Sequence, residues 1–157
     1  MENLSKISTV MEVAEISVSY CPKVKASNRP KVTCSADAYK VFYGMWDQDR
    51  LELVEHFYVM LLNRCNRVLG VSLISSGGFS GTIADPKLIF AIALKAGASA
   101  MILAHNHPSG NLAPSSQDRA LTAKLQHAGS FLDIAVNDHL IICPEGCYYS
   151  FADSGEM

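Results

Sequence analysis

The chain has 157 residues, of which 49% are hydrophobic and 18% are charged. This length and composition predict one globular domain with a hydrophobic core, and they exclude a disordered, collagen-like or coiled-coil protein. A total of 13 Lys and Arg against 15 Asp and Glu gives a formal net charge of -2. The chain therefore lacks the basic excess that non-specific binding to nucleic acid needs, and DNA is possible but not favoured as a partner.

The N-terminal residues and the apolar segments bear on localisation. The first residues, MENLSKIS, show no basic stretch followed by an apolar one, so no secretory signal is expected. The most apolar stretch, Leu88 to Leu103, is interrupted by Lys95 and Gly97 and is shorter than the roughly 20 residues that a membrane span needs. We therefore expect a cytoplasmic protein with no transmembrane helix and no membrane partner.

The five cysteines are an odd number, and none of them forms a Cys-x-x-Cys pair. This pattern favours reduced thiols over a framework of disulfides. Cys143 and Cys147 flank the turn-forming sequence Pro-Glu-Gly and could face each other across a hairpin. We expect a structural role for this pair rather than metal binding or redox chemistry.

The first half of the chain predicts a strand, a helix and a hairpin. Residues 13–20 alternate apolar and polar side chains, which is typical of a half-buried strand. After a polar loop, Ser35 is expected to cap a helix over residues 36–46. Aromatic residues recur along this helix at a spacing that favours packing in the core: Tyr39, Phe42, Tyr43 and Trp46. Two apolar runs, 55–62 and 67–75, predict a β-hairpin.

The second half alternates predicted helices and strands. Asp85 and Pro86 should begin a helix that runs to about residue 96, and residues 99–103 should form a buried strand. Ser115 should begin a second helix that ends at Gly129, before strands over residues 131–143 and 148–151. This order of elements is typical of an α/β domain.

A His-x-His sequence stands at the end of the predicted buried strand. Side chains two residues apart on an extended chain share a face, so His105 and His107 can bind one ion while Asn106 points away. Asp118 falls in the first turn of the next helix, where the helix dipole favours an ionised carboxylate. Two imidazoles and one carboxylate, with no fourth protein ligand nearby, are typical of a catalytic zinc site that keeps a position open for water. Iron(II) or manganese would accept the same ligands.

Each half of this arrangement also has a simpler interpretation. A histidine on a loop is usually solvated, and Ser115 and Asp118 have by themselves the spacing of a helix-capping box. The capping role and the ligand role are compatible, because the cap fixes Ser115 while Asp118 can turn toward an ion. The combination of both halves favours a metal site.

These residues resemble a known motif. His105-x-His107 followed by Ser115 and Asp118 resembles the JAMM motif of the JAB/MPN metal-dependent hydrolases, and the longer run His-Asn-His-Pro-Ser-Gly is similar to the RadC-type bacterial branch. The resemblance implies a single α/β domain with a mixed β-sheet flanked by helices, in the three-layer, cytidine-deaminase-like manner of the JAB/MPN fold. It covers residues 51–157, and residues 1–50 are expected to form an N-terminal extension, a strand plus a helix, packed on that domain.

The resemblance also implies a role for each residue of the motif. His105, His107 and Asp118 would bind one Zn2+ per chain. Glu55 matches the family's general base, with Glu52 as the rival carboxylate, and Ser115 would bind the reacting water or the developing oxyanion. The implied activity is that of a zinc metallopeptidase or isopeptidase, in which a metal-activated water cleaves an amide bond of a peptide or protein substrate.

The match has departures, and other functions stay open. RadC-type proteins usually carry a His-Pro-Arg-Glu segment where this chain has Asp85-Pro-Lys-Leu. Residues 1–50 do not resemble the helix-hairpin-helix region that longer members carry in association with DNA. The alternatives are a DNA-repair-associated accessory protein of RadC type, a non-catalytic protein-binding MPN module, and another metal-dependent reaction such as deamination or phosphodiester hydrolysis.

Overall fold

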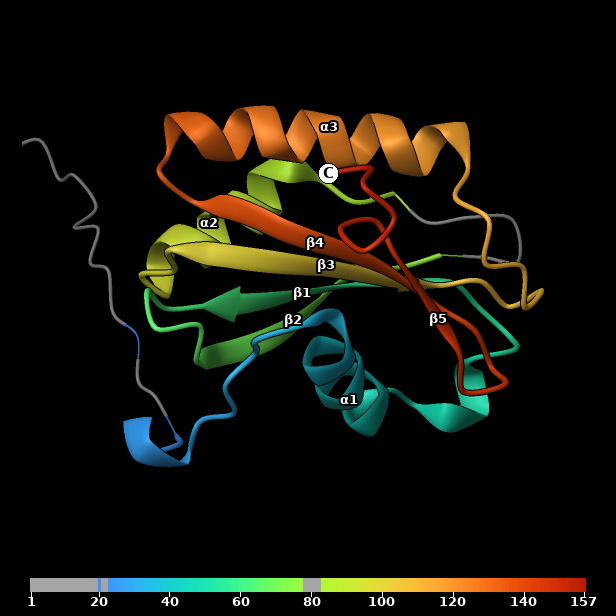
Figure 1. The fold of residues 1–157 in the computed structure, drawn as a ribbon, viewed down its shortest axis with the longest axis horizontal. Helices are drawn as coiled ribbons and strands as arrows, with labels where there is room; N and C mark the ends of the chain where they lie inside the picture. Colours follow the sequence, from blue (N-terminus) through green and yellow to red (C-terminus); the bar gives the residue numbers. More distant parts are fainter. Residues whose placement is uncertain (1–19, 21–22, 78–82) are drawn as a thin grey trace, which may run out of the picture.

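The structure, a computed structural model, describes residue 20 and residues 23–77 and 83–157. Its centre is a five-stranded sheet in the order β2-β1-β3-β4-β5 (Figure 1). The strands are β1 (His56–Leu62), β2 (Val68–Ser76), β3 (Ala100–Asn106), β4 (Ala135–Ile142) and β5 (Tyr148–Ser150). Strands β3 and β4 run parallel, and the other neighbouring pairs are antiparallel. The sheet is therefore mixed, as predicted.

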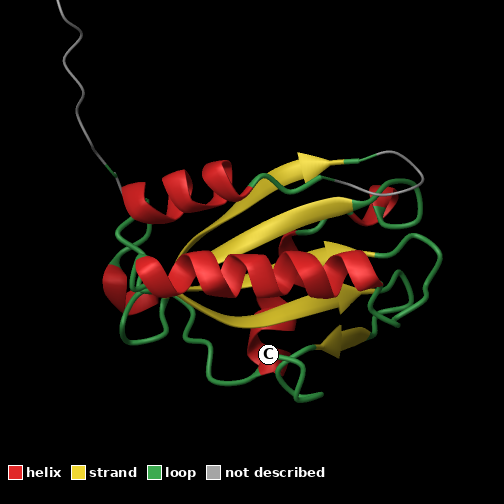
Figure 2. Cartoon of the chain, turned by 90° about the horizontal axis from the view of Figure 1, so that it is seen from above, coloured by secondary structure: helices red, strands yellow, loops and turns green. Residues whose placement is uncertain are grey.

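Within the described residues, three α-helices cover the two faces of this sheet: α1 (Ser35–Met45), α2 (Pro86–Lys95) and α3 (Ser116–Phe131). Helix α1 lies on one face, while α2 and α3 lie on the other (Figures 1 and 2). Short 3-10 helices span Ala26–Asn28 and Gln48–Arg50. The three layers confirm the expected α/β domain with helices on both sides of a mixed sheet.

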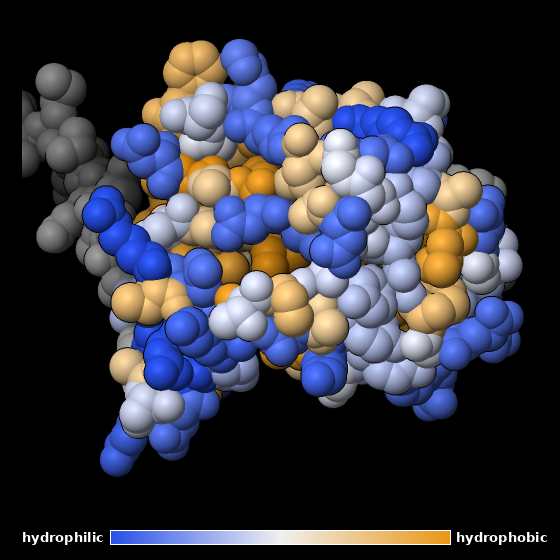
Figure 3. All heavy atoms as spheres, in the orientation of Figure 1, coloured by the Kyte–Doolittle hydropathy of each residue, from blue (hydrophilic) through white to orange (hydrophobic). Residues whose placement is uncertain are grey.

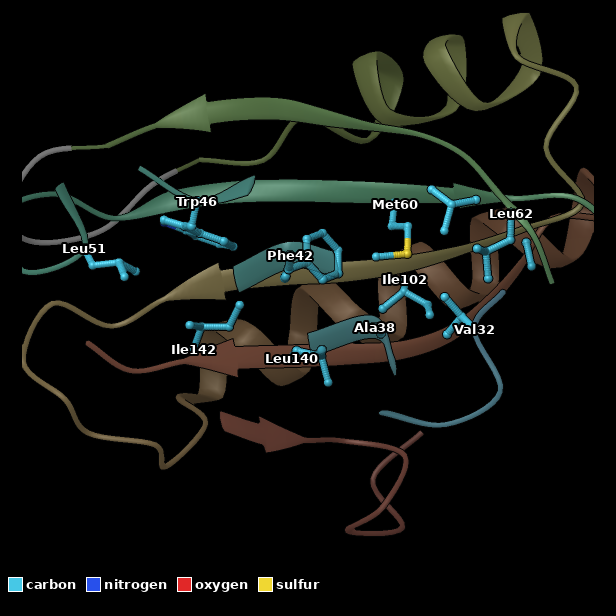
Figure 4. Packing of buried hydrophobic residues seen from close by; sticks show 13 residues of the cluster. Val32, Ala38, Phe42, Trp46, Leu51, Met60, Leu62, Ile102, Leu140 and Ile142 are labelled. Carbon is cyan, nitrogen blue, oxygen red and sulfur yellow. The ribbon is translucent and has the colours of Figure 1, made fainter. Parts of the chain in front are cut away.

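The core consists of two clusters, one on each face of the sheet. Phe42 and Trp46 of the α1 segment pack against the sheet residues Met60, Ile102 and Leu140 (Figure 4). Full burial of one such side chain contributes about 1.5–3 kcal/mol, which accounts for the attachment of α1 to the sheet. The predicted aromatic residues of α1 are thus core residues, with the two tyrosines at the margin of the cluster. On the face seen in Figure 3, hydrophobic residues reach the surface in separate groups among polar ones.

Several predicted boundaries shift by a few residues. Helix α1 begins at Ser35 and its N-cap is Cys34, so the predicted Ser35 cap is wrong by one residue. The Ser35 hydroxyl instead donates to Asp153 Oδ2 at 2.6 Å. The last long strand begins at Ala135 rather than at residue 131, because Phe131 still belongs to α3 and Asp133, with φ of 53°, turns the chain. Of the strand expected at 13–20, all but Tyr20 lies outside the described residues.

One cysteine prediction is wrong. Cys143 and Cys147 form a disulfide across the turn between β4 and β5, although the odd cysteine count favoured reduced thiols. The turn brings their Cα atoms to 5.4 Å, which is within the range that a disulfide requires. Cys34 and Cys65 are free and exposed.

In the described part of the chain, no helix has the length and the apolar composition that crossing a membrane would take.

Candidate metal centre

The centre forms where strand β3 ends. His105 is 1% exposed and pairs in register with Phe57 of β1, whose ring stacks on the imidazole. His107 follows the strand, and its backbone N–H donates to the Ile142 carbonyl of β4 at 3.0 Å. Both histidines are therefore anchored by neighbouring strands. Gly110, with φ of 75°, then allows the turn that returns the chain toward α3.

The first turn of α3 brings a carboxylate to these two rings. Nε2 of His105 lies 2.9 Å from Nε2 of His107 and 3.3 Å from Oδ1 of Asp118. Nε2 of His107 lies 3.8 Å from Oδ2 of Asp118. The structure thus brings together the three predicted ligands, of which His105 and His107 precede Asp118 by 13 and 11 positions in the sequence.

Ser115 and Asp118 form the capping box that their spacing predicts. The Ser115 hydroxyl accepts from the Asp118 N–H at 3.1 Å, and Oδ2 of Asp118 accepts from the Ser115 N–H at 2.7 Å. The hydroxyl hydrogen of Ser115 also points to Oδ2, at 2.6 Å. Oδ1 of Asp118 faces His105 at the same time. The Asp118 side chain can therefore take part in the helix cap and also lie in position to bind a metal.

The geometry of these donor atoms suits a small divalent cation. The ligand atoms of the three residues all lie within 4.8 Å of one another. Two nitrogens bound about 2.0–2.1 Å from a tetrahedral zinc lie about 3.3 Å apart, which is close to the separations found here. Nδ1 of His107 contacts the Asn111 carbonyl, an atom that only accepts, so Nδ1 carries a proton and Nε2 is the ring nitrogen that can bind a metal. The residues present therefore fit a zinc ion.

Burial keeps the inner imidazoles neutral. It lowers the pKa of His105 from 6.5 to about 4, and it also lowers the pKa of His139 well below 6.5. The Asp118 carboxylate opposes this effect at His105, while His107 adds to it. A neutral imidazole is the form that binds a metal.

Glu55, the predicted general base, stands directly before β1 and is partly buried. Phe57, two residues after Glu55, pairs with His105 in the ladder between β1 and β3. Glu55 therefore lies directly before β1 at the end of the sheet where His105 stands. The rival Glu52 is exposed in the preceding turn.

Asn106 was expected only to point away from the histidines, and its actual contacts were missed. Its side chain is fully buried and holds the segment before β1: Oδ1 accepts from the His56 N–H at 2.7 Å, and Nδ2 donates to the carbonyls of Leu51 at 2.8 Å and Val54 at 2.9 Å. The bonds to Val54 and His56 flank Glu55 directly. The signal in the sequence was an amide side chain at the end of the buried strand β3, directly after His105.

His139 is the second residue whose place the sequence left undefined. On β4 it is fully buried, and its Nε2 lies 2.8 Å from Nδ1 of His105. Its Nδ1 lies 2.7 Å from the hydroxyl of Thr122 on α3. His139 thus supports His105 from the neighbouring strand, while Asp138 beside it accepts hydrogen bonds from Ser150 and from the backbone of Ala152.

Comparison with known proteins identifies the family of the chain. The family model described as the RadC-like JAB domain matches residues 32–156. The chain belongs to the RadC-like JAB domain family. The match includes α1 and so begins upstream of Leu51, where the resemblance in the sequence was seen to start.

Two relatives of this RadC-like JAB domain illustrate the similarity. The chain is 44% identical over 126 residues to a UPF0758 protein of Flavobacterium johnsoniae, covering 80% of the chain and 53% of the relative. It is 41% identical over 152 residues to a UPF0758 protein of Porphyromonas gingivalis, covering 96% of the chain and 65% of the relative. The chain therefore spans between about half and two thirds of the length of these relatives. The family has a hydrolase-type fold, and the names of the relatives state no activity.

Proposed function

We propose that this RadC-like JAB domain is a zinc-dependent hydrolase that cleaves an amide, peptide or isopeptide bond in a peptide or protein. The observation that carries the proposal is the convergence of His105, His107 and Asp118 at the sheet end where Glu55 also lies. Three protein ligands leave one position of a tetrahedral zinc open, which is typical of catalytic rather than structural sites.

Glu55 and Ser115 have different roles in the proposed reaction. Bound zinc would lower the pKa of a water toward about 7 and polarise the substrate carbonyl. Glu55 takes the proton of the attacking water and hands it to the leaving amine. Ser115, whose hydroxyl now donates to Asp118, turns that hydrogen toward the developing oxyanion. The formal charge of -2 supports a peptide substrate rather than DNA.

Metal analysis tests the site itself. We expect the purified chain to carry about one zinc per molecule, measured by inductively coupled plasma mass spectrometry. Replacing His107 with Ala removes one ligand and should lower the zinc content at unchanged circular dichroism. Wild-type protein without stoichiometric transition metal, and with no change in metal content in His107→Ala, would contradict the proposal.

Substitution of the base tests the chemistry. Glu55→Gln keeps the size of the side chain but cannot accept the proton, so we expect full zinc content and a loss of hydrolysis of roughly 10²–10⁴-fold. The assay is a screen of peptide and isopeptide substrates, and Glu52→Gln is the matched control with near wild-type turnover. Retained turnover in Glu55→Gln would move the base elsewhere. Salt-dependent DNA binding by fluorescence anisotropy, without any hydrolysis, would favour the accessory role instead.

A further inference from the structure

A chain of buried hydrogen bonds connects one candidate ligand to another. It runs from Nδ1 of His105 to Nε2 of His139 at 2.8 Å, and from Nδ1 of His139 to the Thr122 hydroxyl at 2.7 Å. It ends on the backbone carbonyl of Asp118, to which the Thr122 hydroxyl donates at 2.7 Å. His105, His139 and Thr122 are each at most 2% exposed, so water does not compete for these bonds.

The last acceptor in this series of hydrogen bonds determines which atom carries each proton. The Asp118 carbonyl can only accept, so the single hydrogen of Thr122 must point to it. The Thr122 oxygen therefore accepts from His139, whose proton is on Nδ1. Nε2 of the neutral His139 ring then carries a lone pair and accepts from His105 Nδ1–H. His105 is left with a bare Nε2, the atom that faces His107 and Asp118.

We propose that His139 and Thr122 are positioning residues that lock His105 in the tautomer with Nε2 free to bind a metal. The Asn111 carbonyl holds His107 in the same tautomer through its Nδ1. Two bare nitrogens and a carboxylate then meet within 2.9 to 3.8 Å with no proton among them. Such a cluster of acceptors is stabilised by a cation at its centre.

The consequence for zinc rests on the proposed metal binding, whereas the tautomers exist without any metal. Partners that orient a metal-bound histidine typically change metal affinity 10–100-fold when they are removed. Thr122→Val replaces the hydroxyl by a methyl of similar size and leaves His139 Nδ1 without its acceptor. His139 is then free to protonate on Nε2 and to donate to His105, which would force the proton of His105 onto Nε2, the metal-binding atom.

The first experiment uses the metal-free, 15N-labelled 157-residue chain at pH 7.5. Long-range 1H–15N spectra distinguish protonated from bare imidazole nitrogens, with signals assigned through His139→Gln. We expect Nδ1–H and a bare Nε2 at both His105 and His139. A proton on Nε2 of His105 in the wild-type protein would overturn the proposal, whether or not the chain binds zinc.

The second experiment compares Thr122→Val with Thr122→Ser. The serine keeps the hydroxyl, so its tautomers and its zinc affinity should stay close to those of the wild type. For Thr122→Val we expect the His139 and His105 signals to move away from the Nδ1–H tautomer, and the Kd for zinc, measured by competition with a chelator, to rise roughly 10–100-fold.

The outcomes separate the two ideas. Unchanged tautomers in Thr122→Val, or an equal loss of affinity in Thr122→Ser, would overturn the positioning role. A wild-type chain that shows the expected tautomers but binds no zinc would contradict the proposed function and leave the proton arrangement supported.

Discussion

Asn106 lies between His105 and His107 in the sequence, but its side chain forms hydrogen bonds with residues at and before the start of β1. It donates to the carbonyls of Leu51 and Val54 before β1 and accepts from the N–H of His56, the first residue of β1. One residue thus fixes the distance between β3, which carries the ligands, and the segment that carries Glu55. The sequence places both histidines on one face, but it says nothing about what Asn106 meets on the other.

Replacing Asn106 with Ala should therefore destabilise the protein markedly. A buried polar group that loses its partner costs about 1–3 kcal/mol, and three such groups are affected, so we expect the free energy of unfolding to fall by about 3 kcal/mol or more. Urea denaturation followed by circular dichroism measures it. Asn137→Ala, at an exposed position of β4, is the control and should change stability by less than about 0.5 kcal/mol. A similar small change in Asn106→Ala would show that the bonds contribute little.

At the scale of elements, helix α3 holds the centre together because both Asp118 and Thr122 lie in its first two turns. Its start follows from the capping box, which the sequence predicted. Its end depends on a close approach: a Cβ at Gly129 would lie 2.3 Å from the Ile134 carbonyl oxygen. That contact sets how closely the last turn of α3 approaches the residue before β4.

Gly129→Ala should consequently destabilise the fold, since backbone rather than a flexible side chain must move. We expect a loss of roughly 1–3 kcal/mol or more in the free energy of unfolding, measured by thermal or urea denaturation. Gly44 lies in α1 with nothing within 4 Å of its Cβ position, so Gly44→Ala should stabilise the protein by up to about 1 kcal/mol. Equal effects of the two substitutions would contradict this account of the α3 end.

For the whole molecule, the buried histidines predict a dependence of stability on pH. Burial lowers the pKa of His56, His105 and His139 below the value of 6.5 that these groups have in the unfolded chain. The unfolded state then binds more protons, so their contribution to stability is complete above about pH 6.5. It is lost as the pH falls toward the folded pKa, which is about 4 for His105. Burial raises the pKa of Asp138, and this shift changes the stability with pH in the opposite direction.

We expect the metal-free protein to lose at least about 2 kcal/mol of unfolding free energy between pH 7.5 and pH 5, since one unshared proton changes stability by about 1.4 kcal/mol per pH unit. Urea denaturation at fixed ionic strength measures the slope. His139→Gln removes one of the groups and should flatten it. A stability that stays constant over this range would show that the histidines do not stay neutral in the folded state.

Much of the local structure could be predicted because it depends on neighbours in the chain. Asp85 caps α2 with Pro86 at its first position, the hairpin of β1 and β2 forms at the expected runs, and Ser115 caps α3. The three candidate ligands also come together as their spacing indicated. The catalytic roles of Glu55 and Ser115 stay predictions.

By itself, the sequence determined the α/β class, the positions of the helices, and a His-x-His face followed by an aspartate on a capped helix turn, because side-chain periodicity and capping act over a few residues. Only the tertiary structure decided the strand order, the disulfide between Cys143 and Cys147, and the contacts of Asn106 and His139. His139 reaches His105 across 34 positions of the chain and Asn106 reaches His56 across 50. Contacts of this range depend on strand pairing and register, which local propensity does not encode.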